Sequence, residues 1–191
     1  MTNRTTARRR FLQSLSLGAA ALTVGGVPSA LAHPSSARTR ALRDFAHDFL
    51  PTWKRAGAFT LAYAEAMPAD TYDFRPTPEV RTFAEQMLHI AGANAFFGNR
   101  VSGLPQPDID LKGATTKAEI TSALGEVFDY CAACIRAMPT AEVEEPISLF
   151  EQNFTKEQVV LTMRDHVTHH RGQTAIYLRL NGIVPPQYVG F

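Results

Sequence analysis

The stretch TKEQVVLTMRDHVTHHRGQTAIYLRLN, residues 155–181, has the apolar spacing of one long amphipathic helix. Thr155 is a favourable N-cap residue, and Glu157 lies in the first turn, where a carboxylate interacts well with the helix dipole. Gly182 and then Pro185-Pro186 follow the last apolar residues and predict the end of the helix. Three of the chain's six histidines fall within this one helix.

Two of these histidines are predicted to share the buried face of the helix. At about 100° per residue, His170 lies about 40° from His166, with Val159 and Tyr177 between them at about 20°. These apolar neighbours predict that His166 and His170 lie in the middle of the buried face. His169 lies about 60° away on the other side and is not expected to join them. Two imidazoles at i and i+4 project side by side and can bind a single cation.

A third histidine is predicted to reach the same place from another helix. The stretch TFAEQMLHIAGANAFF, residues 82–97, puts His89 on one stripe with Ala93, Phe96 and Phe97, which the helical period assigns to the inward face. Three histidines that converge inside a helical bundle leave coordination positions of a metal open, as catalytic sites do. The predicted ligands are therefore His89, His166 and His170.

The cofactor is predicted to be one divalent transition metal. Imidazole ligands suit Zn, Ni, Fe and Cu, and the sequence does not select among them. The alternative is three core histidines, each hydrogen-bonded to a neighbour. Burying an unsatisfied polar group costs about 1–3 kcal/mol, so three histidines on inward faces favour the metal. No acidic residue is placed well enough to be named as a fourth ligand.

Gln173 and Arg171 follow His170 closely in the sequence but are predicted to lie on different faces of the helix. Gln173 lies about 20° from His166, one turn after His170. It is predicted either to line the metal pocket or to form a hydrogen bond in the bundle interior. Arg171 points away from the predicted metal face and is expected to pair at the surface or at a subunit contact.

The other apolar runs complete an all-α fold, an up-down four-helix bundle. Thr116 with Glu119 forms a capping box for the third main helix, which should end at Met138 before Pro139. Residues 140–153 are expected to be irregular, with one short extended piece at Ile147–Phe150. The first two main helices are expected from Ala37–Leu50 onward to about Met67, restarted or kinked at Pro51, and from about Arg81 to Ser102.

Cys131 and Cys134 form a C-x-x-C pair inside the third helix. A redox function is one interpretation, but thioredoxin-type pairs lie at a helix N-terminus, which lowers the thiol pKa. A zinc ribbon would need a second pair, which the chain lacks. The sequence favours two small buried residues.

These residues resemble the DinB family of metal-binding four-helix bundles. The resemblance is carried by His89, by His166-x-x-x-His170-Arg-Gly-Gln, by PAD-x-Y-x-FRPTP at residues 68–78 and by Asn-Gly-x-x-Pro-Pro at residues 181–186. It spans about Leu50 to Tyr188. It implies the same bundle and the same three ligands, a homodimer, and the chemistry of a metal-dependent hydrolase or thiol S-transferase.

The N-terminus resembles a twin-arginine export signal. Arg8-Arg9-Arg10-Phe11-Leu12-Gln13 fits the motif, an apolar run follows at Leu15–Val27, and Ala30-Leu31-Ala32 is a cleavage site. A Sec signal peptide or an uncleaved anchor is the alternative, but the run is short for a bilayer and rich in Gly and Ala. We therefore expect a signal peptide at residues 1–32, one domain at 33–191, and a periplasmic location.

Composition limits the class of partner. The chain has 191 residues, of which 45% are hydrophobic and 19% charged, as expected for one globular domain. Without the four leader arginines the formal charge falls from +1 to −3, which gives no support to nucleic-acid binding. No membrane partner is expected after removal of the signal.

The predicted function is that of an exported metal-binding protein acting on a small-molecule substrate. Some relatives use small cytoplasmic thiols, which an exported protein would lack, so hydrolysis is favoured over thiol transfer. The alternative is a non-catalytic periplasmic protein that binds a metal or a small ligand.

Overall fold

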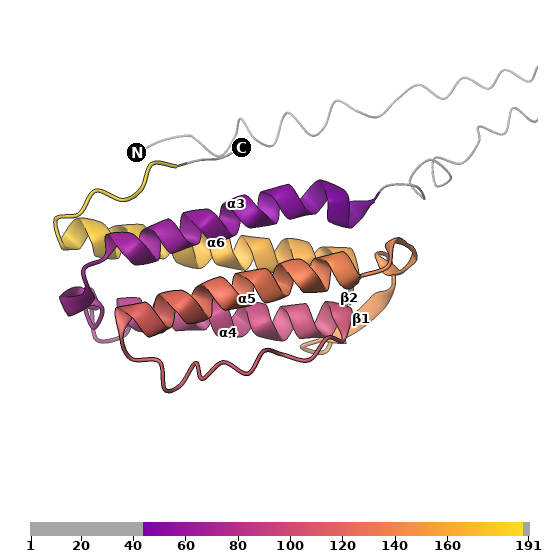
Figure 1. Ribbon diagram of the computed structural model, residues 1–191, viewed down its shortest axis with the longest axis horizontal. Helices are drawn as coiled ribbons and strands as arrows, with labels where there is room; N and C mark the ends of the chain where they lie inside the picture. Colours follow the sequence, from indigo (N-terminus) through magenta and orange to yellow (C-terminus); the bar gives the residue numbers. More distant parts are fainter. Residues whose placement is uncertain (1–43, 189–191) are drawn as a thin grey trace, which may run out of the picture. The chain divides into compact units, whose positions relative to one another are not determined.

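Four α-helices form the described part of the protein, residues 44–188 (Figure 1). The computed structural model places them as α3 Phe45–Ala66, α4 Phe83–Ser102, α5 Lys117–Ala137 and α6 Lys156–Leu180. The predicted all-α four-helix bundle is confirmed. The predicted signal peptide and the beginning of the helix predicted from Ala37 lie outside the described residues. None of the helices between residues 44 and 188 combines the length and the apolar character needed to cross a membrane.

Three of the helices begin at a threonine that caps them. Each threonine hydroxyl accepts the backbone N–H three positions on, and the side chain of that later residue accepts the threonine N–H in return. The predicted box at Thr116 and the predicted N-cap at Thr155 are both present. The three pairs are Thr82–Glu85, Thr116–Glu119 and Thr155–Gln158.

Helix α3 runs through Pro51 without a break. It begins after Asp44, whose side chain accepts the N–H of His47 at 3.0 Å. Proline lacks the backbone N–H that would complete the helical ladder, but the buried side chains of Phe49 and Trp53 hold the helix on both sides of it. The two alternatives for Pro51 were a fresh helix and a kink in a continuous one, and the structure has one continuous helix through Pro51.

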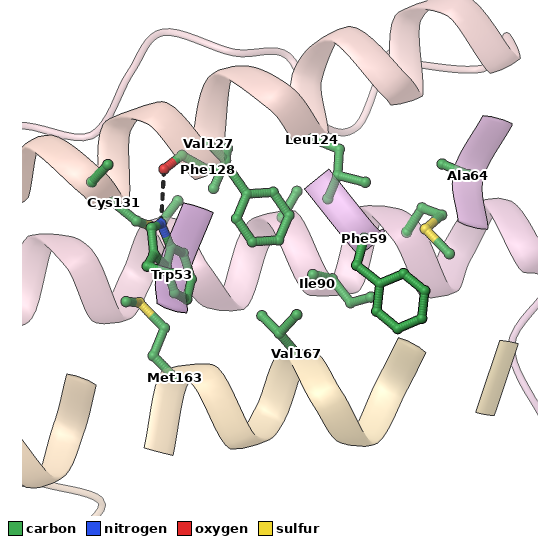
Figure 2. Packing of buried hydrophobic residues seen from close by; sticks show 14 of the residues in the cluster. Trp53, Phe59, Ala64, Ile90, Leu124, Val127, Phe128, Cys131, Met163 and Val167 are labelled. Carbon is green, nitrogen blue, oxygen red and sulfur yellow. Dashed lines mark hydrogen bonds between the residues drawn. The ribbon is translucent and has the colours of Figure 1, made fainter. Parts of the chain in front are cut away.

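Each helix packs against two others around one apolar core. Helix α4 packs on α5 and α6, and α3 packs on the same two helices, so α3 and α4 lie at opposite corners of the bundle. Figure 2 shows the core, where the indole N–H of Trp53 donates to the backbone oxygen of Phe128 at 3.0 Å. Met163 and Val167 of α6 point into the same core.

The chain includes one long return connection. Residues 103–116 run back along the bundle, so α4 and α5 point the same way, while α3 and α6 point the opposite way (Figure 1). The predicted up-down order, in which consecutive helices alternate in direction, therefore fails between α4 and α5, because the long connection returns the chain to the end of the bundle where α4 began. Gly103 ends α4 with φ 72°, a left-handed conformation that glycine adopts without strain. Because α4 and α6 are antiparallel neighbours, the first half of α4 lies beside the second half of α6.

A β-hairpin replaces the irregular segment predicted before α6. Strand β1, Pro146–Leu149, pairs antiparallel with β2, Gln152–Thr155. The predicted extended piece overlaps β1, but β2 was not expected, because the turn Phe150-Glu151 lacks the Gly or Asn that marks such turns. Strand β2 continues directly into α6, since Thr155 is both its last residue and the helix N-cap.

Candidate metal centre

The structure brings His89, His166 and His170 together at the contact between α4 and α6. Nε2 of His89 lies 3.1 Å from Nε2 of His170 and 3.1 Å from Nε2 of His166. One nitrogen from each ring falls within 4.8 Å of the other two. Two nitrogens bound to one tetrahedral zinc ion would lie about 3.3 Å apart. The two distances from His89 are therefore close to those between ligands of one ion, and the third pair of nitrogens lies within 4.8 Å.

Two glutamines hold His170 in one orientation. Nδ1 of His170 lies 3.0 Å from Oε1 of Gln86 and 3.0 Å from Oε1 of Gln173. Both atoms are acceptors, so Nδ1 carries the proton and donates it. The lone pair of His170 is thereby fixed on Nε2, the atom that faces His89 and would bind the metal.

The glutamine contacts continue away from the histidines. Nε2 of Gln86 lies 3.3 Å from Oε1 of Gln173 and 3.5 Å from the hydroxyl of Tyr177, which donates to the backbone oxygen of Arg81 at 2.8 Å. Nε2 of Gln173 lies 3.0 Å from Nε2 of the exposed His169. Gln173 thus lies beside His170 and forms hydrogen bonds there. Gln86 was missed, although it lies three residues before His89 on α4, one turn away on a neighbouring face.

Burial and mutual repulsion keep the three rings neutral. Burial, and after it the proximity of His89, lowers the pKa of His170 to about 4. Burial, followed by repulsion from His170 and His89, lowers the pKa of His166 to about 4. Burial and the charge of Arg81 lower the pKa of His89. Since the ordinary value is about 6.5, all three rings are neutral at pH 7, the state that a metal ion requires of imidazole.

Neutral rings have only one proton to offer to the two close contacts between these nitrogens. Nε2 of His170 has no proton, so His89 would have to donate to it from its own Nε2. That nitrogen then has no lone pair left to accept a proton from His166 and no second proton to give. The single Nε2 proton of His89 would then have to be shared between His170 and His166, whereas a cation could be bound by all three nitrogens. The donor set fits a transition metal.

The site lies nearer the edge of the bundle than the helical periods predict. On α6 the most deeply buried positions include Val167 and Thr174, so the buried face is centred about 80° from His166. His166 and His89 are half-buried, and Phe96, on the stripe predicted to face inward, is 37% exposed. The prediction that the histidines lie in the middle of the buried helix faces was wrong. Helix α6 also packs on α3, and its buried face is turned toward α3.

Arg171 is buried, which contradicts its predicted place at the surface or a subunit contact. Its guanidinium donates to the backbone oxygen of Ala56 at 3.3 Å and to the hydroxyl of Thr60 at 3.2 Å. It also lies 4.5 Å from the centre of the Phe59 ring, a cation–π contact. The same rotation of the buried face toward α3 explains the error, and burial lowers the pKa of Arg171.

The two cysteines are packing residues. Both are buried and reduced, and Cys131 donates its thiol proton to the backbone oxygen of Asn94 at 3.2 Å. Burial raises the pKa of the Cys131 thiol, which opposes the thiolate that redox chemistry needs. A methyl group at Gly98 would lie 3.3 Å from both sulfur atoms. The cysteines thus face a close approach of α4 and α5.

Known proteins resemble this chain in sequence pattern and in fold. A family model described as the DinB superfamily matches residues 52–174, a range that includes all three histidines. A DinB-like protein from Bacillus subtilis superposes with a TM-score of 0.61 at 17% identity, over 74% of this chain and 96% of that one. A DinB-like protein from Bacillus cereus ATCC 10987 gives 0.66 at 16% identity, over 75% and 97%. At such identities the two structures share the fold with this chain. No protein of curated function matches the sequence.

Proposed function

This chain belongs to the DinB superfamily, and from that membership we propose that it binds one divalent transition metal through His89, His166 and His170. The observation that carries the proposal is the meeting of three imidazole nitrogens from two helices at ligand spacing, with both contacts of His89 Nε2 at 3.1 Å. Low pKa values support it, because neutral rings need lose no proton before they bind.

The metal would serve chemistry on a small molecule. An ion with three imidazole ligands supplies Lewis acidity at its remaining positions. The chain's own part is to orient the ligands, which Gln86 and Gln173 do for His170, and to leave one side of the centre accessible. That accessibility is supported by the half-buried state of His89 and His166. We favour a metal-dependent hydrolase, with thiol S-transfer as the second reaction class.

The proposal extends to location and assembly. The twin-arginine motif supports export to the periplasm through that pathway, with no nucleic-acid partner and no membrane contact after cleavage. A homodimer is supported by the outer face of α6, where Ile176 is 58% exposed and Leu180 is 59% exposed. Sedimentation of the protein with Ile176→Asp would test that face, and an unchanged dimer would exclude it.

Metal content is the deciding measurement. Residues 33–191, purified without a histidine tag, are expected to contain about one transition-metal ion per chain by elemental mass spectrometry, and His170→Ala should lose it. His47→Ala is the control, since His47 is exposed and contacts Asp48 near the start of α3. The proposal fails if the wild type takes up no metal after reconstitution, or if His170→Ala retains it. A tightly closed site that admits no small-molecule probe would favour a non-catalytic binding protein.

A further inference from the structure

Three phenylalanine rings lead outward from the metal centre. The ring of Phe97 lies edge-on to His166, with centroids 6.2 Å apart. Phe96 follows at 5.5 Å from Phe97, and Phe150 at 5.9 Å from Phe96. The rings thus connect a predicted metal ligand on α6, through α4, to the tip of the β-hairpin. We call Phe97, Phe96 and Phe150 the aromatic row.

The aromatic row becomes more exposed with distance from the metal centre. Phe97 is half-buried, Phe96 is 37% exposed and Phe150 is 72% exposed. With roughly 200 Å² for each phenylalanine side chain, Phe96 and Phe150 expose about 220 Å². A stable interface between two proteins buries about 800 Å² per partner. The row is therefore of a size to cover one side of a small molecule and too small by itself to hold a second subunit.

The hairpin turn holds Phe150 in a conformation that its residue type disfavours. Phe150 has φ 51° and Glu151 has φ 63°. Two positive φ values in a two-residue hairpin are the pattern of a type I′ turn, which Asn-Gly forms with much less strain. A bulky residue in this region is an outlier. Neither turn formation nor core packing explains a phenylalanine at this position, whereas contact with a ligand would.

The hairpin is fixed to both helices that carry the histidines. Its backbone is tied to α4 by Arg100, which donates to the carbonyl of Ser148 at 3.3 Å. It is joined to α6 through Thr155, and Lys156 at the start of α6 forms ion pairs with Glu142 and, at 3.7 Å, with Glu145. Phe150 is therefore carried on a segment that contacts both helices of the metal centre.

We propose that the aromatic row binds the apolar, ring-bearing part of a small substrate whose polar group binds at the metal centre. Flat aromatic side chains recognise such groups by stacking and edge contacts, while the metal fixes the polar end. The inference rests on the proposed metal binding and adds the substrate class, a molecule with a metal-binding head joined to an aromatic or other apolar body.

Binding of hydroxamates to zinc-loaded protein tests this substrate class. Acetohydroxamate supplies the metal-binding head alone, and phenylalkyl hydroxamates with one to five methylene groups add a ring at increasing distance. By calorimetry, the best phenyl compound is expected to bind the wild type about tenfold more tightly than acetohydroxamate, or better.

A variant with both turn residues replaced tests the contribution of the Phe150 ring to binding without weakening the fold. Phe150→Asn with Glu151→Gly keeps a favourable type I′ turn and removes the ring. We expect this double variant to lose most of the phenyl preference, to bind acetohydroxamate unchanged and, without metal, to melt at the same temperature or higher. Phe96→Ala should reduce the preference independently. Val184→Ala removes an apolar residue that is 81% exposed and lies outside both the row and the proposed dimer face, and it should leave the preference intact.

The outcomes distinguish failure of the substrate class from failure of the metal centre. Equal binding of all hydroxamates to the wild type, or a phenyl preference that survives both row variants, would overturn the inference while the metal centre stands. Conversion of a dimer to a monomer by the row variants, with the preference unchanged, would overturn it in favour of a contact between copies. If acetohydroxamate binds no better to zinc-treated wild type than to His170→Ala, the metal proposal falls and this inference with it.

Discussion

At the scale of single residues, the hydrogen bonds that orient the His170 ring also decide which of its nitrogens can bind a metal. Its Nδ1 proton is divided between Oε1 of Gln86 and Oε1 of Gln173, both at 3.0 Å. A hydrogen bond of this kind selects the tautomer and makes the other nitrogen a better ligand. The two glutamines come from different helices, so the ring is held from two sides.

Replacing Gln86 should weaken metal binding without removing a ligand. Gln86→Leu keeps the volume near that of glutamine but leaves the Nδ1 proton of His170 with Gln173 alone. We expect zinc affinity to fall about 10- to 100-fold, the usual effect of losing such a partner, as measured by competition with a fluorescent chelator. Gln152→Leu, in the exposed part of the hairpin, is the matched control. Equal affinities in the two variants would show that Gln86 does not orient the ring.

The pH dependence of the metal-free protein follows from the two lowered pKa values. His166 and His170 have pKa values of about 4 in the folded protein, against about 6.5 when unfolded. Between these values the unfolded chain binds more protons, so acid favours unfolding. Stability from these groups should be complete above pH 6.5 and should fall as the pH drops from 6.5 to 4.

Thermal melts of the metal-free protein at several pH values would check this. The double variant His166→Gln with His170→Gln has no titrating group at these positions and should show a flatter melting temperature across the same window. If the wild type and the variant lose stability in parallel between pH 6.5 and 4, the histidines are not the cause.

The sequence predicts the features of the site that depend on local spacing, but it does not predict those that depend on how the helices pack. The i, i+4 spacing of His166 and His170 is local, so it could be read directly. The positions of Gln86 and Arg171 depend on which helices flank α6, and no local pattern states this. Arg171 is the clearest case, because α6 turns it toward Ala56 and Thr60 of α3.

At the scale of elements, helix boundaries were predictable because their causes lie within a few residues. Thr116 and Glu119 cap α5 through contacts three positions apart, and Gly103 ends α4 at a left-handed φ of 72°. The hairpin was not predictable, since Phe150-Glu151 contradicts the usual turn chemistry. Local rules therefore failed at the element that carries Phe150, the outermost ring of the aromatic row.

The N-cap of α6 should contribute a measurable share of stability. Thr155→Ala removes the hydroxyl that accepts the N–H of Gln158 at 3.1 Å. We expect the free energy of unfolding to fall by about 1 kcal/mol in denaturant titrations. Thr168→Ala, which removes an exposed mid-helix hydroxyl bonded to the backbone oxygen of Arg164, should change it by less than about 0.5 kcal/mol. Equal losses would mean that the cap has no special role.

At the scale of the whole molecule, the metal would join two helices that are distant in the chain. His89 is 77 residues from His166 and 81 residues from His170. A ligand that binds only the folded state stabilises it by mass action, by about 2.7 kcal/mol at a hundredfold excess over Kd.

Zinc should therefore raise the melting temperature of the protein by about 5–10 °C at that excess. The same zinc concentration should raise the melting temperature of His89→Ala much less, because only the two ligands of α6 remain. Differential scanning fluorimetry with and without a chelator provides the measurement. A shift of the same size in both proteins would place the bound zinc elsewhere.

The separation of the ligands along the chain also sets an order of events during synthesis. His89 emerges long before His166 and His170, and it cannot meet them until α6 has docked on α4 and the return connection at residues 103–116 is in place. Long-range contacts of this kind form late in folding. A bound ion would thus mark the chains in which α4 and α6 have met. Metal uptake by a refolding chain would then time the docking of α6 on α4, in addition to preparing the centre for chemistry.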